Sequence, residues 1–204
     1  MLTALVLSMS AMAQTKLTAA QQQKIVEKVN RSTSAITSMQ CSFTQTKSMK
    51  MLSKKMQSGG VMYYKKPNKL RWQYTHPYDY TFVMNGDKVN IKSAKSSQKI
   101  DVQRNKMFRQ ITDIILSTVT GGSLKNSADF TVEMFKDDRQ YFARLYPKKK
   151  ELKQIYQVIE IYFNSELTMV SSVKMLEKTG DATTVTLTGV KTNQPVNEKV
   201  FSVN

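Results

Sequence analysis

The side chains that most often perform catalysis or bind metals are few in this chain and widely separated. There is one histidine, His76, beside Pro77, and one cysteine, Cys41. Base catalysis by histidine needs a partner group within hydrogen-bond reach, and zinc sites need several Cys or His ligands at short spacing. Neither pattern occurs, and there is no phosphate-binding glycine loop or Gly-x-Ser-x-Gly nucleophile. We therefore expect a protein that is not an enzyme and uses no metal or cofactor.

Adaptable apolar side chains are abundant instead. The chain has 13 methionines, several of them at inward positions of the expected strands. Methionine fills irregular spaces and tolerates changing partners. Ordinary core packing explains any single one of them, whereas together they favour a lining that accepts variable acyl chains.

The first thirteen residues have the character of a secretory signal. Residues 2–11 are small or apolar, no charge precedes Lys16, and Ala11-Met12-Ala13 matches a small-residue cleavage pattern. The stretch is too short to span a bilayer as a stable helix. We predict cleavage after Ala13, a periplasmic location, and one domain over residues 14–204. Export makes a nucleic-acid partner improbable for a chain of net charge +16, and it favours an anionic lipid or protein surface.

Alternating apolar residues predict β-strands over most of the mature chain. The period of two begins at Met39, Cys41 and Phe43 and continues in short segments joined by turns such as Asn85-Gly86-Asp87. This pattern is typical of an antiparallel meander. Lysines fall on the opposite parity or in turns, which favours a solvated outer face; they are Lys47, Lys54, Lys55, Lys65, Lys69, Lys88, Lys92 and Lys95.

Two segments have helical spacing. Residues 18–37 predict a helix with Thr18 as N-cap, and residues 105–120 predict a second helix with a broad apolar face, ended by Gly121-Gly122. A single curved sheet with one apolar face has no second sheet to cover it, so we expect both helices to lie against that face. The fold class is α+β, mainly β.

Residues 41–91 resemble the LolA family of lipoprotein carriers. The resemblance consists of ordered motifs: Phe43-Thr44-Gln45, Gly59-Gly60, Lys65-Lys66-Pro67-Asn68, Leu70-Arg71-Trp72, Pro77 and Asn85-Gly86-Asp87. Beyond about residue 105 only the order of elements is similar, including the helix before the later strands. Each motif alone is weak, and their order and spacing make the resemblance specific.

The resemblance implies an unclosed antiparallel β-barrel whose two helices form a lid over a hydrophobic cavity. It implies a monomeric periplasmic chaperone that takes lipoproteins by their acyl chains from an inner-membrane ABC exporter to an outer-membrane receptor, touching membranes only transiently. That receptor carries a lipidated N-terminal cysteine. Cys41 lies well inside the mature chain, so the resemblance favours the carrier over the receptor.

The expected acyl-binding residues lie on one parity of the strands and on one face of the second helix. On strands they are Met62, Tyr64, Leu70, Trp72, Tyr74, Tyr80, Phe82 and Met84; on the helix they are Phe108, Ile111 and Ile115. In the family an Arg before the Pro of the basic turn latches the lid to the barrel. This chain has Lys66 there, a point charge without the planar fork of Arg, so Lys66 is only a candidate latch.

Two other functions remain open. The same fold can carry another amphiphile, such as a glycolipid or pigment lipid, and the departure at Lys66 and the high charge favour this divergence. Alternatively, the helices pack permanently and the chain is a non-lipid periplasmic interaction module. A carrier is physically necessary for lipoproteins, because burying one chain of about sixteen carbons contributes on the order of 12 kcal/mol at about 0.8 kcal/mol per CH₂.

Overall fold

The computed structural model describes residues 14–93, 96–101, 124 and 129–202. Strands dominate this part of the chain. They are β1 (Thr15–Lys16), β2 (Ser38–Met49), β3 (Lys54–Lys65), β4 (Lys69–His76), β5 (Tyr80–Asn85), β6 (Lys88–Ser93), β7 (Ser97–Asp101), β8 (Phe130–Lys136), β9 (Tyr141–Pro147), β10 (Tyr156–Phe163), β11 (Val170–Glu177) and β12 (Ala182–Thr192). The helices are α1 (Ala19–Ser34), α3 (Lys150–Ile155) and the short 3₁₀ helix η2 (Glu198–Phe201).

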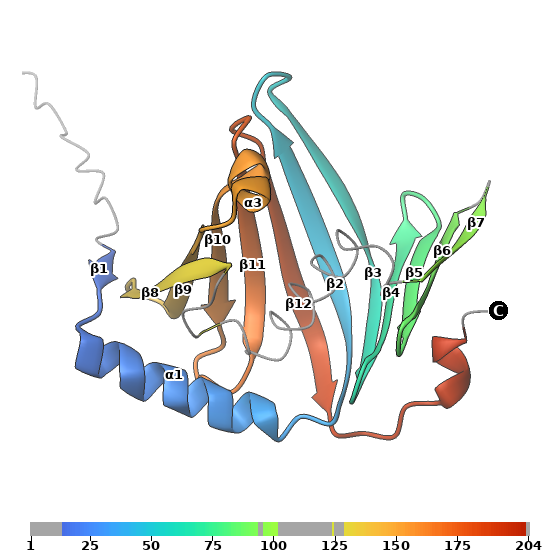
Figure 1. The fold of residues 1–204 in the computed structure, drawn as a ribbon, viewed down its shortest axis with the longest axis horizontal. Coiled ribbons are helices and arrows are strands. Elements are labelled where there is room, and N and C mark those ends of the chain that lie inside the picture. Colours follow the sequence, from blue (N-terminus) through green and yellow to red (C-terminus); the bar gives the residue numbers. More distant parts are fainter. Residues whose placement is uncertain (1–13, 94–95, 102–123, 125–128, 203–204) are drawn as a thin grey trace, which may run out of the picture.

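All twelve strands belong to one antiparallel sheet in the order β1-β8-β9-β10-β11-β12-β2-β3-β4-β5-β6-β7. The pairing of β12 with β2 joins the C-terminal strands to the N-terminal meander. The sheet curves strongly (Figure 1), and its two edge strands, β1 and β7, are not paired with each other. The expected mainly-β fold with an unclosed antiparallel barrel and accompanying helices is therefore confirmed.

The helix expected at residues 18–37 forms as α1. The Thr18 side chain accepts a hydrogen bond from the Gln21 amide, and the Gln21 side chain accepts one from the Thr18 amide. This reciprocal capping box satisfies donors that the first helical turn leaves unpaired. Val29 is fully buried in the core of the sheet, and α1 runs across one end of the barrel (Figure 1). The helix expected over residues 105–120 lies outside the described residues.

One face of the sheet is apolar from β8 to β6. Cross-strand pairs place Met62 opposite Cys41 and Trp72, and they place Ile161 opposite Val173 and Ala143. Since neighbouring strands keep the same parity, apolar residues of successive strands form rows on the concave side. The rows form two clusters, one under α1 on β8–β11 and the other on β2–β6 and β12.

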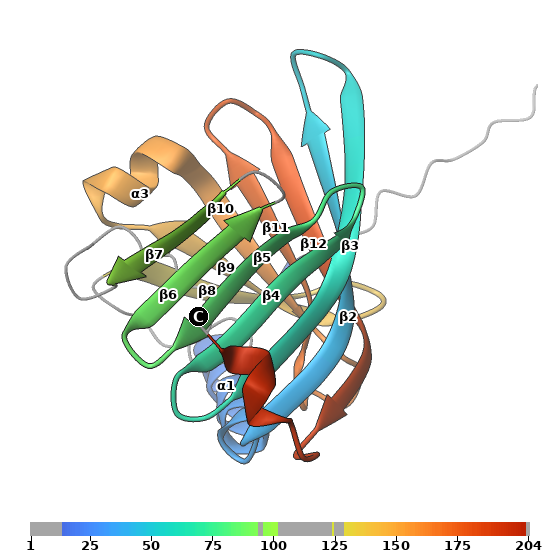
Figure 2. The ribbon, with the colours of Figure 1, turned by 90° about the vertical axis from the view of Figure 1, so that its right-hand side faces the viewer.

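The convex side carries two smaller contacts that the sequence pattern did not predict. η2 lies against the outside of β4 and β5 (Figure 2), where Phe201 is fully buried. Glu198 binds Lys65 and Lys69 at 2.5 and 2.6 Å. At the other side of the sheet, Phe142 stacks between two rings and is also fully buried; those rings belong to Phe135 and Tyr162.

Candidate functional site

An aromatic cluster occupies the concave face where β2, β3, β4 and β5 meet. The Phe43 ring lies 4.3 Å from the Trp72 ring and 5.1 Å from the Tyr74 ring, centroid to centroid. Tyr74 also contacts Tyr80 edge-on at 6.0 Å. Such tilted and edge-on pairs are the favoured aromatic geometries and add about 0.5–1.5 kcal/mol each beyond burial.

Gly60 makes this cluster possible. It pairs with Phe43 on one side and with Tyr74 on the other, at a register shift in β3. A Cβ atom at Gly60 would lie 1.8 Å from the Gln73 carbonyl oxygen, so no larger residue fits without moving the backbone of β4. The missing side chain lets the backbones of β3 and β4 approach closely between Phe43 and Tyr74. The close approach of the β4 backbone therefore explains the glycine at position 60 of the Gly59-Gly60 motif.

The strand residues expected to bind acyl chains all lie on the concave face, but they differ in burial. Met62, Tyr64, Leu70, Phe82 and Met84 are buried in the core cluster of β2–β6. Trp72, Tyr74 and Tyr80 are only partly buried and pack against that cluster. The buried residues hold the sheet together, and the partly buried rings present apolar surface that a ligand can cover. Phe108, Ile111 and Ile115 lie outside the described residues.

Desolvation affects the buried and the partly buried tyrosines in the same direction. Burial raises the pKa of the Tyr64, Tyr74 and Tyr80 hydroxyls above the usual value for tyrosine. The Tyr74 hydroxyl donates a hydrogen bond to Gln45 Oε1 at 2.9 Å, which satisfies its polar end at the edge of the apolar face. All three side chains therefore stay neutral at physiological pH and act as apolar surface.

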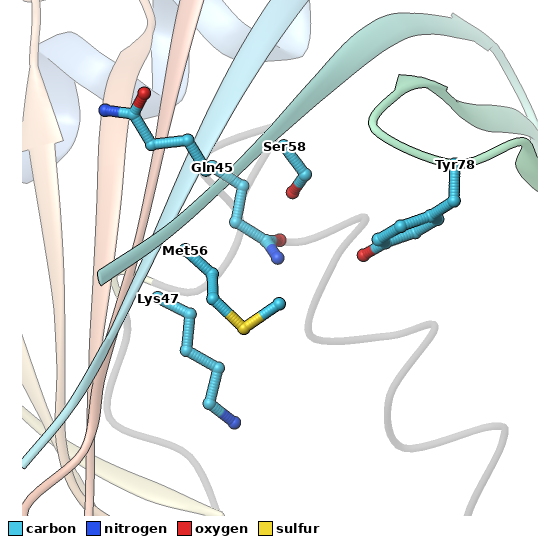
Figure 3. A pocket seen from close by; sticks show the side chains of 6 residues that line it. Gln45, Lys47, Met56, Ser58 and Tyr78 are labelled. Carbon is cyan, nitrogen blue, oxygen red and sulfur yellow. The ribbon is translucent and has the colours of Figure 1, made fainter. Parts of the chain in front are cut away.

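A small pocket opens between the end of β2, the start of β3 and the β4–β5 turn (Figure 3), next to Tyr74, which is hydrogen-bonded to Gln45. It is lined by Gln45, Lys47, Met56, Gln57, Ser58 and Tyr78. Its volume is about 70 Å³, which is room for a few waters and too little for a whole acyl chain. The pocket adds polar groups to one end of the apolar face.

The pocket also corrects one sequence prediction. Lys47 was expected on the solvated outer face, but it has the parity of Phe43 and Gln45 and lines the pocket on the concave side. The reason is its position near the end of β2, beyond the apolar cluster, where the inward parity no longer requires an apolar side chain. The Lys47 Nζ also lies 3.6 Å from the Glu177 Oε1.

The candidate latch Lys66 contacts the C-terminal end of α1. Its Nζ donates a hydrogen bond to the Ser34 carbonyl oxygen at 2.6 Å, and its backbone amide donates to the Thr37 carbonyl oxygen at 2.8 Å. A cation beside the unpaired carbonyls of a helix C-terminus is stabilising. Lys66 therefore fastens α1 to the start of the β3–β4 turn, whereas the second expected helix is not described.

Cys41 and His76 are the residues whose side chains could have taken part in catalysis. Burial raises the pKa of the Cys41 thiol to about 12, so the nucleophilic thiolate is absent at neutral pH. His76 is the exposed last residue of β4, and its Nδ1 lies 3.4 Å from the Thr75 hydroxyl. The described residues contain no group of three or more side chains that could hold a metal ion. The geometry favours binding of apolar matter.

The family comparison agrees with this geometry. A model of the family described as outer membrane lipoprotein carrier protein LolA matches residues 34–204. The chain belongs to the LolA family. Members of this family are periplasmic carriers that bind their cargo and do not catalyse a reaction, which implies that the chain is secreted. The sequence-based resemblance is confirmed.

Individual relatives are distant. The chain is 24% identical over 164 residues to an outer-membrane lipoprotein carrier protein of Methylococcus capsulatus, covering 80% of this chain and 75% of that protein. Its structure is similar to a chain of the MucA/MucB complex of Pseudomonas aeruginosa, with a TM-score of 0.54 at 11% identity, over 90% of this chain and 61% of that one.

A second structural neighbour is the lipoprotein LppX of Mycobacterium tuberculosis. The TM-score is 0.50 at 12% identity, over 88% of this chain and 99% of that one. At such identities the two structures establish a shared fold alone. None of the helices in the described part of this chain is long and apolar enough to cross a membrane.

Proposed function

We propose that this LolA-family protein is a non-enzymatic carrier that holds the acyl chains of lipoproteins against its concave face. One observation carries the proposal: the concave face is apolar from β8 to β6, and at Trp72, Tyr74 and Tyr80 it remains partly accessible. Large rings that stay partly accessible beside a buried core give a ligand apolar surface to cover. The carrier name of the relative from Methylococcus capsulatus supports the same function.

The proposed carrier moves its cargo from an inner-membrane ABC exporter to an outer-membrane lipoprotein receptor. Removal of residues 1–13 leaves a monomeric single-domain chain, 14–204, in the periplasm. The helix that the sequence predicts over residues 105–120, with Phe108, Ile111 and Ile115, lies outside the described residues, and in this proposal it is the cover of the acyl-binding face when no cargo is bound. A cover that refills the site lowers the net affinity for an acyl chain, because its own contacts must first be displaced, and this permits hand-over.

The rings and the pocket suggest how an acyl chain lies in the carrier. One apolar track runs along β4 and β5 and consists of Trp72, Tyr74 and Tyr80. The pocket with Gln45 and Ser58 lies at the end of that track. An acyl chain lies along the track, and the polar glycerol and peptide of the lipoprotein lie toward the pocket. This orientation keeps polar atoms near hydrogen-bonding groups.

Native mass spectrometry tests the proposal. The mature chain is mixed with a purified triacylated lipoprotein and, separately, with the same lipoprotein lacking its acyl chains. We expect a one-to-one complex only with the acylated form, because the acyl chains supply the binding free energy. Equal binding of both forms, or binding of neither, contradicts lipoprotein carriage.

A second candidate is a carrier of another amphiphile, such as a glycolipid. The observation in its favour is the polar and cationic lining of Gln45, Lys47 and Ser58 beside the apolar track, which suits a free lipid with a polar or anionic headgroup. Mass spectrometry of the lipid that copurifies with the protein separates the two candidates. A single glycolipid or pigment lipid in place of lipoprotein would favour the second.

A further inference from the structure

The exposed hydrophobic side chains of the described residues gather at one end of the barrel. The six large ones are Met51, Leu52, Met56, Tyr78, Tyr146 and Ile155. They lie in five segments: the β2–β3 turn, the start of β3, the β4–β5 turn, the end of β9 and the end of α3. The β11–β12 turn completes this end. We call residues 47–58, 76–80, 146–156 and 177–182 the basic rim.

The strand register places these segments at the same end. Ser48 at the end of β2 pairs with Ala182 at the start of β12, and Tyr156 at the start of β10 pairs with Glu177 at the end of β11. The amide of Lys178 also donates to the Ile155 carbonyl oxygen at 2.9 Å. Figure 1 shows α3 and the β2–β3 and β11–β12 turns together, with α1 across the opposite end.

The β2–β3 hairpin projects furthest. The pairing between β3 and β4 ends at Gly59 and His76, so the first residues of β3 extend beyond the neighbouring strand (Figure 2). At the hairpin tip Met51 is 92% exposed and Leu52 is 68% exposed. Adjacent apolar residues that are this exposed at a turn contribute nothing to the core, and they are available to another apolar phase.

Positive charge surrounds these apolar residues. The basic rim contains nine lysines and four carboxylates: Lys47, Lys50, Lys54, Lys55, Lys148, Lys149, Lys150, Lys153 and Lys178 against Asp79, Glu151, Glu177 and Asp181. Lys47 pairs with Glu177, and Lys149 pairs with Asp129. Lys50, Lys54 and Lys55 at the hairpin tip are exposed and make no ion pair with any other described residue.

We propose that the basic rim docks on the surface of a bilayer containing anionic phospholipid. Met51 and Leu52 enter the boundary between headgroups and acyl chains, and the neighbouring lysines bind lipid phosphates. Apolar side chains flanked by lysines are the usual elements of interfacial binding, and lysine stems can lie along the apolar zone while their ammonium groups reach the headgroups.

A lipid surface fits these residues better than a protein partner does. The rim contains no arginine, whereas protein interfaces are enriched in Arg and depleted in Lys. Its exposed apolar residues stand on several separate segments of the chain. A fluid bilayer accommodates such separated side chains, while a protein partner needs matching pockets for each.

Docking by this end would open the concave face toward the membrane. Met56 and Tyr78 belong to the basic rim and also line the pocket next to Gln45, so the rim and the acyl-binding track are continuous. This consequence rests on the proposed function, but the docking itself does not, because it requires only the empty protein and a vesicle.

Vesicle flotation tests the docking. Cargo-free protein is mixed with vesicles of phosphatidylcholine alone or of phosphatidylcholine with phosphatidylglycerol. We expect binding to the anionic vesicles, weakened by salt. The double variant Lys54→Gln/Lys55→Gln should lose affinity on the order of twenty-five-fold, since each lysine near an anionic surface contributes about fivefold. The matched control Lys24→Gln/Lys28→Gln makes the same charge change on exposed positions of α1 and should bind within about twofold of the natural protein.

A fluorescent label reports the depth of insertion. Cys41 is buried, so a thiol reagent labels Leu52→Cys selectively in the folded protein. We expect the emission of an environment-sensitive label at position 52 to shift to the blue on anionic vesicles. The same label at Lys28→Cys should show no shift.

Equal binding of the two lysine double variants, no flotation of the natural protein, or a label at position 52 that stays in water would each overturn the proposal. Melting curves confirm that every variant is folded. The lipoprotein experiment above contains no vesicles, so failure of docking and failure of lipoprotein carriage are distinguished.

Discussion

Substitution of Trp72 by glutamate should remove acyl binding and leave the fold intact. Trp72 pairs with Met62 on β3 and with Phe82 on β5, and its ring packs on Phe43. All three neighbours are apolar, so a carboxylate at position 72 finds no cation among these described neighbours. An acyl chain that covers it must bury an unpaired charge.

The expected loss of affinity follows from two contributions. A ring of this size contacts about three methylenes of an acyl chain, which at about 0.8 kcal/mol each is roughly 2 kcal/mol. Burial of an uncompensated carboxylate adds a cost of several kcal/mol. Together the two contributions exceed about 3 kcal/mol, which raises the dissociation constant more than about a hundredfold. Because Trp72 is only partly buried, its loss should lower the folding free energy by about 2 kcal/mol, which a domain of ordinary stability tolerates.

The assay is fluorescence anisotropy of a triacylated lipopeptide labelled on its peptide. The matched control is Gln73→Glu, which adds the same carboxylate to the next position of β4 on the outer face. There the Gln73 side chain already accepts a hydrogen bond from Arg71 Nε at 3.0 Å, so the new charge has a cationic partner. Binding of the lipopeptide by folded Trp72→Glu within about threefold of the natural protein would refute the proposed lining.

Three further predictions concern the fold around the site. Gly60→Ala should lower the free energy of unfolding by about 3 kcal/mol, because the new Cβ meets the Gln73 carbonyl oxygen. Gly86→Ala should lower it by only about 1 kcal/mol, because the space there is open and only the positive φ of 61° is strained. Chemical denaturation measures both free energies. Lys66→Met should lower protection of the last turn of α1 from hydrogen exchange, because the Ser34 carbonyl loses its donor; Lys24→Met should not. Hydrogen bonds from Lys65 and then Lys69 lower the pKa of Glu198 to about 2. The stability that this carboxylate gives to η2 should therefore be complete above the unfolded pKa near 4.5 and lost as the pH falls toward 2. An NMR titration of the Glu198 carboxyl with an ordinary midpoint would contradict this.

The sequence predicted the N-terminal half of the sheet well because one face of those strands is buried. Where Phe43, Met62, Trp72 and Phe82 lie on the same face, a slip of one residue would expose all of them, and the period of two therefore appears in the chain. α1 could be predicted equally well, since Thr18 and Gln21 form its capping box. Both are cases in which a local pattern and tertiary burial impose the same requirement.

The parts that sequence reasoning missed lack such a pattern. α3 is a single short helix that buries only Leu152 among its lysines, and η2 is held by the isolated anchor Phe201 and by Glu198. The pocket residues Gln45 and Ser58 are polar and belong to strands that were expected, but only the pairing of β2 with β3 brings them together. Contacts between residues distant in the chain leave no periodic signal in either partner.

The two ends of the barrel have opposite physical characters, and this difference bears on how a carrier could release its cargo. α1 lies across one end and is fixed there by its capping box, by Val29 in the core and by Lys66. The other end carries only the short helix α3 among the described residues, and it presents the basic rim and the pocket. Under the proposed function, an acyl chain must therefore enter and leave by the same end. Transfer then requires an acceptor that competes for the acyl chain at the rim, because passage through the barrel would have to break the contacts that hold α1.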